Sequence, residues 1–110
     1  MKVDQIGSVS VVRLLERVDS VSCREVESTL QTLTAANPRQ VICDCTATQY
    51  ISSAGLRVFL TTAKHLKQNG GQLALVCATN QYVHEVLALT GITHFVPVFE
   101  TLEEALSKLA

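Results

Sequence analysis

Hydrophobic positions along the chain form short runs, some with the spacing of strands and others with the spacing of helices. Two β-prone runs, Lys2–Ile6 and Val9–Leu15, are joined by Gly7–Ser8, which is typical of a β-hairpin. Three later runs are almost continuously apolar, as in strands buried on both faces of a sheet. These runs are Gln40–Cys45, Gln72–Ala78 and Phe95–Phe99, the last predicted to be an edge strand because it contains Pro97.

Four further segments have the apolar spacing of amphipathic helices. The first is expected to begin at a capping box formed by Ser22 and Glu25 and to end at Asn37–Pro38. The second begins near Ser52–Ser53 and the third at Thr79 or Asn80. The fourth begins at a second capping box, Thr101 to Glu104.

The order of elements is therefore ββαβαβαβα. Each βαβ unit is expected to be right-handed and parallel, whereas the initial hairpin is antiparallel. We predict an α/β fold with one domain over residues 1–110: a single-layer mixed sheet, parallel after the hairpin, with four helices.

Composition excludes several classes of protein. With 47% hydrophobic residues the chain is globular rather than disordered, and a net charge of −1 provides no basic surface for nucleic acid. The longest apolar run, Leu73–Ala78, is too short to span a membrane. Because Met1–Asp4 does not resemble the start of a signal peptide, we expect a cytoplasmic protein. No motif indicates a cofactor.

The cysteines and histidines do not have the spacing of a metal or catalytic site. Cys43 and Cys45 lie two positions apart in a predicted strand, so both face one side, where thiols pack as small hydrophobic groups. Buried thiols are poorly placed to react, which argues against an oxidoreductase. Two other cysteines and three histidines are isolated from one another in sequence: Cys23, Cys77, His65, His84 and His94.

The most distinctive stretch is Tyr50–Arg57, which follows a predicted buried strand. It places two serines, Ser52 and Ser53, at the start of a helix, followed by the small residues Ala54 and Gly55. One interpretation is structural, since a serine commonly caps a helix N-terminus, but this accounts for one serine only. The other is modification, because a helix N-terminus tolerates a phosphate and the small residues leave room for a partner. Neither a Gly-x-Ser-x-Gly motif nor a phosphate-binding Gly-rich loop is present.

Together with the preceding Val41–Cys45, this stretch resembles the STAS domains, the family of sulphate transporters and anti-sigma factor antagonists. The resemblance extends over nearly the whole chain. In the family a strand carrying a polar Asp or Asn is followed by a loop and by Asp-Ser-(Ser/Thr/Ala)-Gly-Leu. Asp44 and the run Ser52–Leu56 match this pattern, and Asp19 matches an acidic residue that follows the second strand.

The resemblance implies a non-enzymatic regulator, a bacterial anti-sigma factor antagonist that is monomeric or weakly dimeric. Such a protein binds an anti-sigma factor, which is a serine kinase of the histidine-kinase-like ATPase fold, and thereby releases a sigma factor. Phosphorylation of the serine two residues before the motif glycine breaks the complex, and a metal-dependent serine phosphatase restores binding. That serine is Ser53, with Ser52 as the less favoured acceptor. The residues expected to contact the partner are Asp19, Ser20, Asp44, Ser52, Ser53, Ala54, Gly55 and Arg57.

Three positions depart from the family pattern. Ser52 stands where an Asp is usual, while Arg57 and Glu16 stand where Gly is common. Arg57 is either an exposed helical residue or a partner for a phosphate or an acidic group. Asp44 either holds the loop or orients the serine, or is a solvated residue at a strand end. The alternative function is an unphosphorylated docking module, or a module that binds a small molecule or nucleotide at the strand ends.

Overall fold

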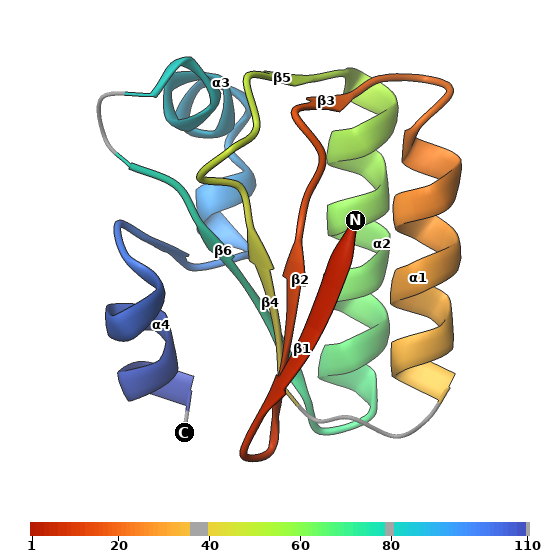
Figure 1. Ribbon diagram of the computed structural model, residues 1–110, viewed down its shortest axis with the longest axis vertical. Helices are drawn as coiled ribbons and strands as arrows, with labels where there is room; N and C mark the ends of the chain where they lie inside the picture. The colour runs from red at the N-terminus through yellow and green to blue at the C-terminus, as the bar shows by residue number, and fades with distance from the viewer. Residues whose placement is uncertain (36–39, 79–80, 110) are drawn as a thin grey trace.

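The computed structural model describes residues 1–35, 40–78 and 81–109 (Figure 1). The first half contains β1 (Lys2–Ile6), β2 (Val9–Arg13), β3 (Arg17–Val18), α1 (Cys23–Ala35), β4 (Gln40–Asp44) and β5 (Tyr50–Ile51). The second half contains α2 (Ser53–Gln68), β6 (Gln72–Val76), α3 (Tyr82–Thr90), the short 3-10 helix η1 (Ile92–His94), β7 (Val98–Phe99) and α4 (Leu102–Leu109).

The main sheet has five strands in the order β1-β2-β4-β6-β7. Strands β1 and β2 pair antiparallel around a turn in which Gly7 has a φ of 61°, and the other pairs are parallel. The predicted α/β class, the hairpin and the parallel remainder of the sheet are thereby confirmed. A second sheet, β3 paired in parallel with β5, was not predicted.

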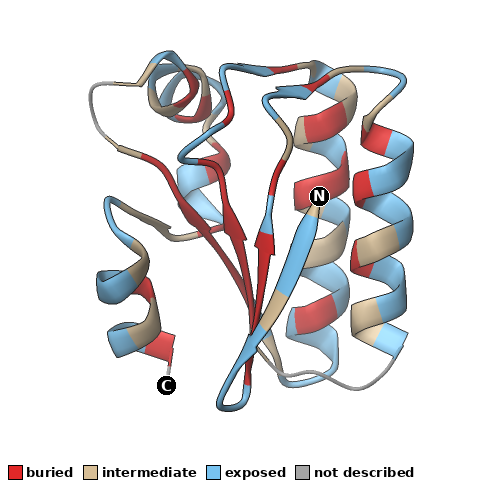
Figure 2. Cartoon of the chain, viewed as in Figure 1, coloured by how far each residue is buried: buried red, intermediate tan, exposed pale blue. Residues whose placement is uncertain are grey.

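The sheet is covered by helices on both faces. Because the parallel strands follow one another in a single direction across the sheet, right-handed crossovers place their helices on one face. Buried residues of α1, α2, α3 and η1 accordingly form one hydrophobic cluster, which contains Val12, Cys43 and Leu75. The other face, with Val11, Ile42 and other strand residues, packs against α4 alone. Figure 2 shows the buried strands between these layers.

Each of the later predicted strands differs from the structure at one end: β4 ends at Asp44 rather than Cys45, and β6 ends at Val76 rather than Ala78. Strand β2 ends at Arg13 rather than Leu15, because the chain then turns to form β3. The predicted strand Phe95–Phe99 is reduced to Val98–Phe99, and Phe95 lies outside it with a 73% exposed side chain. Phe95 is instead the C-cap of η1, and the N–H groups of Phe95 and Val96 donate to the carbonyl of Ile92, so the first residues of the predicted strand form the end of this short helix.

The predicted helix starts are only partly correct. Thr101 Oγ1 accepts from the N–H of Glu104, as the second capping box requires. Helix α1 begins at Cys23, directly after Ser22, as predicted, but the Oγ of Ser22 bonds to the backbone of Arg17 and Asp19 and not to that of Glu25. Helix α3 has Gln81 as its N-cap, while Thr79, Asn80, Asn37 and Pro38 lie outside the described residues.

Candidate partner-binding site

The two adjacent serines at the start of α2 have different environments. Ser52 is the N-cap: its backbone is extended and its Oγ accepts from the N–H of Gly55 at 3.2 Å. Ser53 is the first helical residue and its side chain is exposed. Within the described parts of the chain, Ser53 Oγ makes no hydrogen bond. Ser52 is thus occupied by capping the helix, whereas the hydroxyl of Ser53 is presented to solvent.

The electrostatic setting of Ser53 suits an added negative charge. The first turn of α2 contains no acidic residue, so the positive end of the helix dipole is not neutralised there. Arg57, also exposed, lies four residues further along the helix and therefore on the same side as Ser53. A phosphate on Ser53 would meet the free N–H groups of the first turn and a guanidinium within one helical turn.

A small second sheet fixes the position of this helix start. Strands β3 and β5 pair Arg17 with Tyr50 and Val18 with Ile51, and the N–H of Ser52 donates to the carbonyl of Val18 at 2.8 Å. The guanidinium of Arg17 lies 4.6 Å from the centre of the Tyr50 ring. This stacking adds about 0.5–1 kcal/mol at an exposed site. The loops after β2 and β4 are therefore joined to each other beside Ser53.

Gly55 is required by packing inside the protein. It is buried, and a Cβ there would lie 2.8 Å from Val18 Cγ1 and 3.2 Å from Ile51 Cγ2. The interpretation that Gly55 leaves room for a partner is wrong, because β3 already fills that space. Ala54 is half-buried and packs against the core, so it offers a partner only part of its surface.

Asp19 and Ser20 lie directly after β3, next to the start of α2. Asp19 Oδ1 accepts from the N–H groups of Val21 and Ser22 at 3.0 and 2.9 Å. The pKa of Asp19 is lowered, chiefly by the backbone hydrogen bond from Ser22, and also by the Ser22 hydroxyl and the Val21 N–H. This carboxylate thus forms the turn that leads into α1, the role that the capping box was expected to play. Ser20 is exposed beside it.

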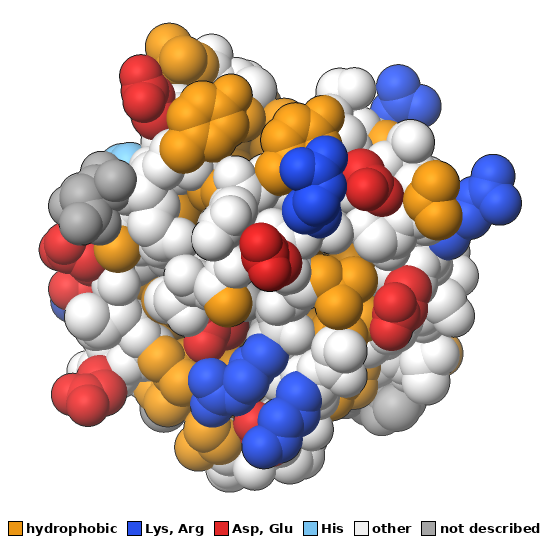
Figure 3. All heavy atoms as spheres, turned by 45° about the horizontal axis from the view of Figure 1, so that its top comes forward, with side chains coloured by type: hydrophobic (Ala, Val, Ile, Leu, Met, Phe, Trp, Pro, Cys, Tyr) orange, Lys and Arg blue, Asp and Glu red, His pale blue; other side chains and the backbone are white. Residues whose placement is uncertain are grey.

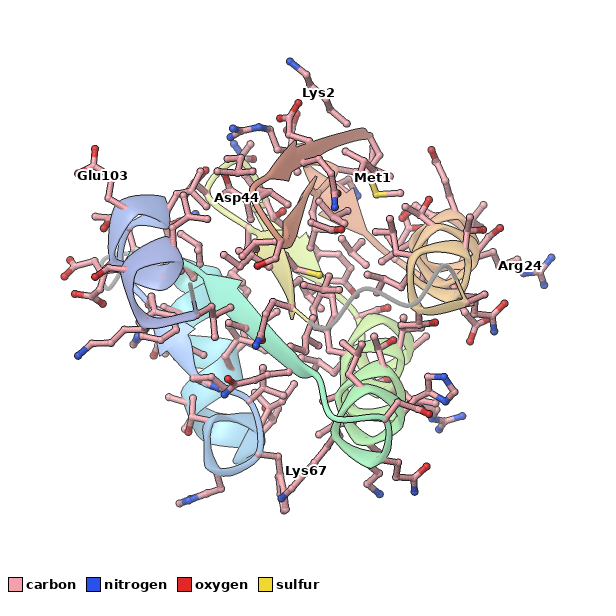
Figure 4. The ribbon with its side chains drawn as sticks, turned by 90° about the horizontal axis from the view of Figure 1, so that it is seen from below. Met1, Lys2, Arg24, Asp44, Lys67 and Glu103 are labelled. Carbon is pink, nitrogen blue, oxygen red and sulfur yellow. The ribbon has the colours of Figure 1, made fainter. Side chains whose placement is uncertain are left out.

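Asp44 lies on the other face of the sheet. Its side chain is only 6% exposed, and Oδ2 pairs with Arg13 Nη1 at 3.1 Å while Oδ1 accepts from the N–H of Thr46. Strand alternation places it opposite Cys43 and Cys45, on the side covered by α4, as Figure 4 shows. Asp44 thus holds the loop after β4, one of the two predicted roles. The expectation that it surrounds Ser53 is wrong.

Replacing Asp44 by Ala is expected to lower the free energy of unfolding by about 2–3 kcal/mol, since a buried charge-assisted bond and a loop N–H lose their acceptor. Arg13 is 43% exposed, so the cation left behind stays solvated and the loss falls below that of a fully buried pair. Urea denaturation measures the effect.

Asp4→Ala is the matched control, because Asp4 pairs with the same guanidinium at 3.0 Å but at the surface, where such pairs contribute about 0–1 kcal/mol. Equal losses for the two variants would contradict the assignment. Partner affinity should be the same for Asp44→Ala and the wild type.

The predicted burial of Cys43 and Cys45 is confirmed, and Cys23 and Cys77 are buried as well. All four are free thiols in the core, and burial raises the pKa of Cys43 from an ordinary 9.0 to about 12 and that of Cys77 to about 11. Burial likewise raises the pKa of Cys45. These thiols are protonated at neutral pH and shielded, which leaves them unsuited to nucleophilic or redox catalysis.

Two measurements follow for the thiols. A disulfide reagent at neutral pH is expected to titrate the thiols quickly in urea and slowly in the native protein. Because the folded state retains thiol protons above pH 9.0 that the unfolded state releases, the free energy of unfolding should fall as pH rises from 9 toward 12. Rapid native reaction of a thiol, or a rise in stability over that range, would contradict this account.

One important residue of this region was missed in the sequence. Gln81 Nε2 donates to the carbonyls of Thr46 at 3.0 Å and Thr48 at 3.5 Å, while its Oε1 accepts from Ala78 N at 2.7 Å. It therefore ties the start of α3 to the loop that leads into β5. The carbonyl partners precede it by 35 and 33 positions, so local spacing gave no sign of the contact.

Over the described ranges, no three His, Cys, Asp or Glu side chains cluster closely enough to hold a metal ion. His65 and His94 are exposed and His84 is half-buried, on separate elements. None of the helices in those same ranges has the length and apolar character needed to cross a membrane.

Comparison with known proteins places the chain in a family. The model of the STAS domain matches residues 1–105, so the chain belongs to the STAS domain family. BtrV of Bordetella bronchiseptica, described as a candidate anti-sigma factor antagonist, is 34% identical over 96% of this chain and 90% of its own length. The crystal structure of an anti-sigma factor antagonist from Mycobacterium paratuberculosis has a TM-score of 0.89 at 25% identity, covering 98% of this chain and 91% of that one.

The fold is shared more widely. The structure of SpoIIAA in its unphosphorylated form has a TM-score of 0.81 at 17% identity, over 97% of this chain and 93% of that one. At that identity the likeness concerns the fold. The expected family is thus confirmed by a sequence model and by relatives that align along nearly the whole chain.

Proposed function

We propose that this protein is an anti-sigma factor antagonist that is switched by phosphorylation of Ser53. The observation that carries the proposal is that the two adjacent serines have different roles in the structure. Ser52 caps α2 through its Oγ, whereas Ser53 is exposed and unbonded among the described residues. The names of the relatives BtrV and the Mycobacterium paratuberculosis protein support the assignment to this class.

The partner in this proposal is an anti-sigma factor that is also a serine kinase of the histidine-kinase-like ATPase fold. The unphosphorylated protein binds it and the sigma factor is released. A kinase must bring its ATP to Ser53 Oγ, so the surface around Ser53 is covered in the complex. The protein itself contributes no catalytic group to the transfer; it presents the hydroxyl on a rigid helix start.

Phosphorylation ends the interaction through charge. A phosphoserine adds about −1.5 to −2 charges, which a close interface must strip of water. On a chain of net charge −1 this is a large change at one point of the surface. Unless the partner supplies a cation there, the unpaired dianion disfavours the complex. A metal-dependent serine phosphatase, by removing the phosphate, returns the protein to its binding form.

Ser52 in place of the usual Asp does not impair the helix start, since Ser and Asp cap helices about equally well. It does leave two hydroxyls in sequence, so the acceptor has to be tested. The structure favours Ser53, because the Oγ of Ser52 is held by the Gly55 N–H and lies at a half-buried position.

Phosphate mapping tests the proposal. The purified protein is incubated with the anti-sigma kinase and ATP, and the modified residue is located by mass spectrometry in wild type, Ser53→Ala and Ser52→Asn. Asn keeps the cap without a hydroxyl or a charge. We expect phosphate on wild type and Ser52→Asn and none on Ser53→Ala. Phosphate that persists in Ser53→Ala, or binding without phosphate on any form, would contradict the switch.

The ligand-binding alternative predicts a pocket at the carboxyl ends of the strands. A hollow of about 340 Å³ lies instead along α1 and α2, lined by residues such as Gln31, Thr62 and His65. These residues belong to the later turns of both helices, away from their starts beside β3 and β5. This hollow does not support the strand-end pocket.

A further inference from the structure

We infer that the outer face of α3, formed by Tyr82, Val86 and Leu89, is part of the surface that binds the anti-sigma factor. The inference rests on the proposed function and extends the contact surface beyond the residues predicted for it.

The apolar residues of α3 are not confined to the side that faces the core. Val83 and Leu87 are 1% and 0% exposed and belong to the core. Tyr82 is 63% exposed and Leu89 is 81% exposed, and half-buried Val86 lies between them. At 3.6 residues per turn, these three lie about a third of a turn around the helix from Val83 and Leu87. The spacing of 4 and 7 residues aligns these three along one stripe. The apolar surface of α3 thus extends beyond the side that faces the core, and no described segment of the chain covers Tyr82 and Leu89.

The stripe is continuous with the region of Ser53. Gln81, the residue before Tyr82, is bonded to the loop that leads into β5, and β5 connects this loop to the start of α2. Tyr50 on β5 is 37% exposed and carries the guanidinium of Arg17. Figure 3 shows hydrophobic side chains gathered over this end of the molecule, with charged groups among them.

The area of a typical protein interface favours the anti-sigma factor, bound around Ser53, as the protein that covers the stripe. A stable protein interface covers about 800 Å² on each side, a patch roughly 30 Å across. The whole molecule measures 30 × 28 × 25 Å, so an interface centred on Ser53 covers most of the end that carries β3, β5 and α3. A kinase that reaches Ser53 therefore also lies over the stripe, where Tyr and Leu side chains lose water on contact.

The test is the affinity of the double variant Tyr82→Ser, Leu89→Ser for the purified anti-sigma kinase, measured by titration calorimetry without ATP. We expect a loss of affinity of about tenfold or more. Phe95→Ser is the matched control, because Phe95 is 73% exposed but lines a hollow with Gly70 and Gln72 at the other end of the sheet. Its affinity should equal that of wild type. Urea midpoints show that each variant is folded.

Ser53→Glu in the same assay shows whether a negative result concerns the stripe alone or the proposed function as well. If Ser53→Glu abolishes binding while the double variant binds as wild type, the stripe lies outside the interface and this inference is overturned, with the proposed function intact. If wild type itself fails to bind, the proposed function fails and the inference with it. A wild-type dimer in sedimentation that the double variant converts to a monomer would assign the stripe to self-association and also overturn the inference.

Discussion

Ser53→Glu is expected to lower the affinity for the anti-sigma factor by about 100-fold or more, because burying an unpaired carboxylate in an interface costs about 2–5 kcal/mol. Ser53 is exposed and its Oγ is free within the described chain, so the cost arises in the complex and not in the free protein. A carboxylate at the first position of α2 in fact stabilises the helix by about 0.3–1 kcal/mol. Affinity should therefore fall while the urea midpoint stays equal or rises.

A variant that binds more weakly but unfolds at an equal or higher urea concentration has lost affinity through its charge. A variant that is misfolded would lose both affinity and stability. Ser53→Ala, which is neutral and smaller, is the control, and we expect its affinity to remain within a few-fold of wild type. If Ser53→Glu binds as tightly as wild type, charge at this position does not control the complex. If Ser53→Ala also loses binding, the hydroxyl itself is needed for contact, and the charge argument does not account for the result.

Gly55→Ala is expected to lower the free energy of unfolding by about 1–3 kcal/mol, the usual cost of overpacking. In an exposed helix the same change would add about 1 kcal/mol, because alanine favours helix more strongly than glycine. The sign reverses here because the new Cβ would lie 2.8 Å from Val18 Cγ1 and 3.4 Å from the Val18 carbonyl oxygen. Denaturation in urea gives the sign directly.

A double-mutant cycle with Val18→Ala tests the cause of this loss. Removing Cγ1 of Val18 opens a cavity and is destabilising alone, but the added methyl of Gly55→Ala then meets less resistance. We expect Gly55→Ala to cost less in the Val18→Ala background than in wild type. An equal cost in both backgrounds would place the strain elsewhere, and a stabilising Gly55→Ala would contradict the packing account altogether.

The sequence was sufficient for the features that depend on local spacing. The hairpin at Gly7 and the parallel strands followed from apolar runs and turn residues, and the N-cap role of a serine followed from its place before an apolar helix face. The burial of Cys43 and Cys45 followed from period-two alternation. The same alternation places Asp44 on the opposite face from these cysteines. Its separation from Ser53 could not be predicted, because the sequence alone did not show which face α2 covers.

Features that depend on distant contacts were not predictable from one sequence. Strands β3 and β5 have two residues each, too few for a periodic pattern, and they form only because each supplies the other with hydrogen bonds. The buried role of Gly55 depends on Val18, 37 positions before it, and Gln81 reaches carbonyls more than 30 positions before it. Each of these contacts is made between segments that the fold brings together.

Control of binding by phosphorylation is tested by comparing one preparation of the protein in three states, by calorimetric titration with the anti-sigma kinase. The states are unmodified, fully phosphorylated on Ser53, and treated with a metal-dependent serine phosphatase. We expect tight binding by the unmodified protein, an affinity about 100-fold or more lower for the phosphorylated protein, and full recovery of affinity after phosphatase treatment. Equal affinity of the unmodified and phosphorylated forms would contradict control of the complex by Ser53 phosphorylation.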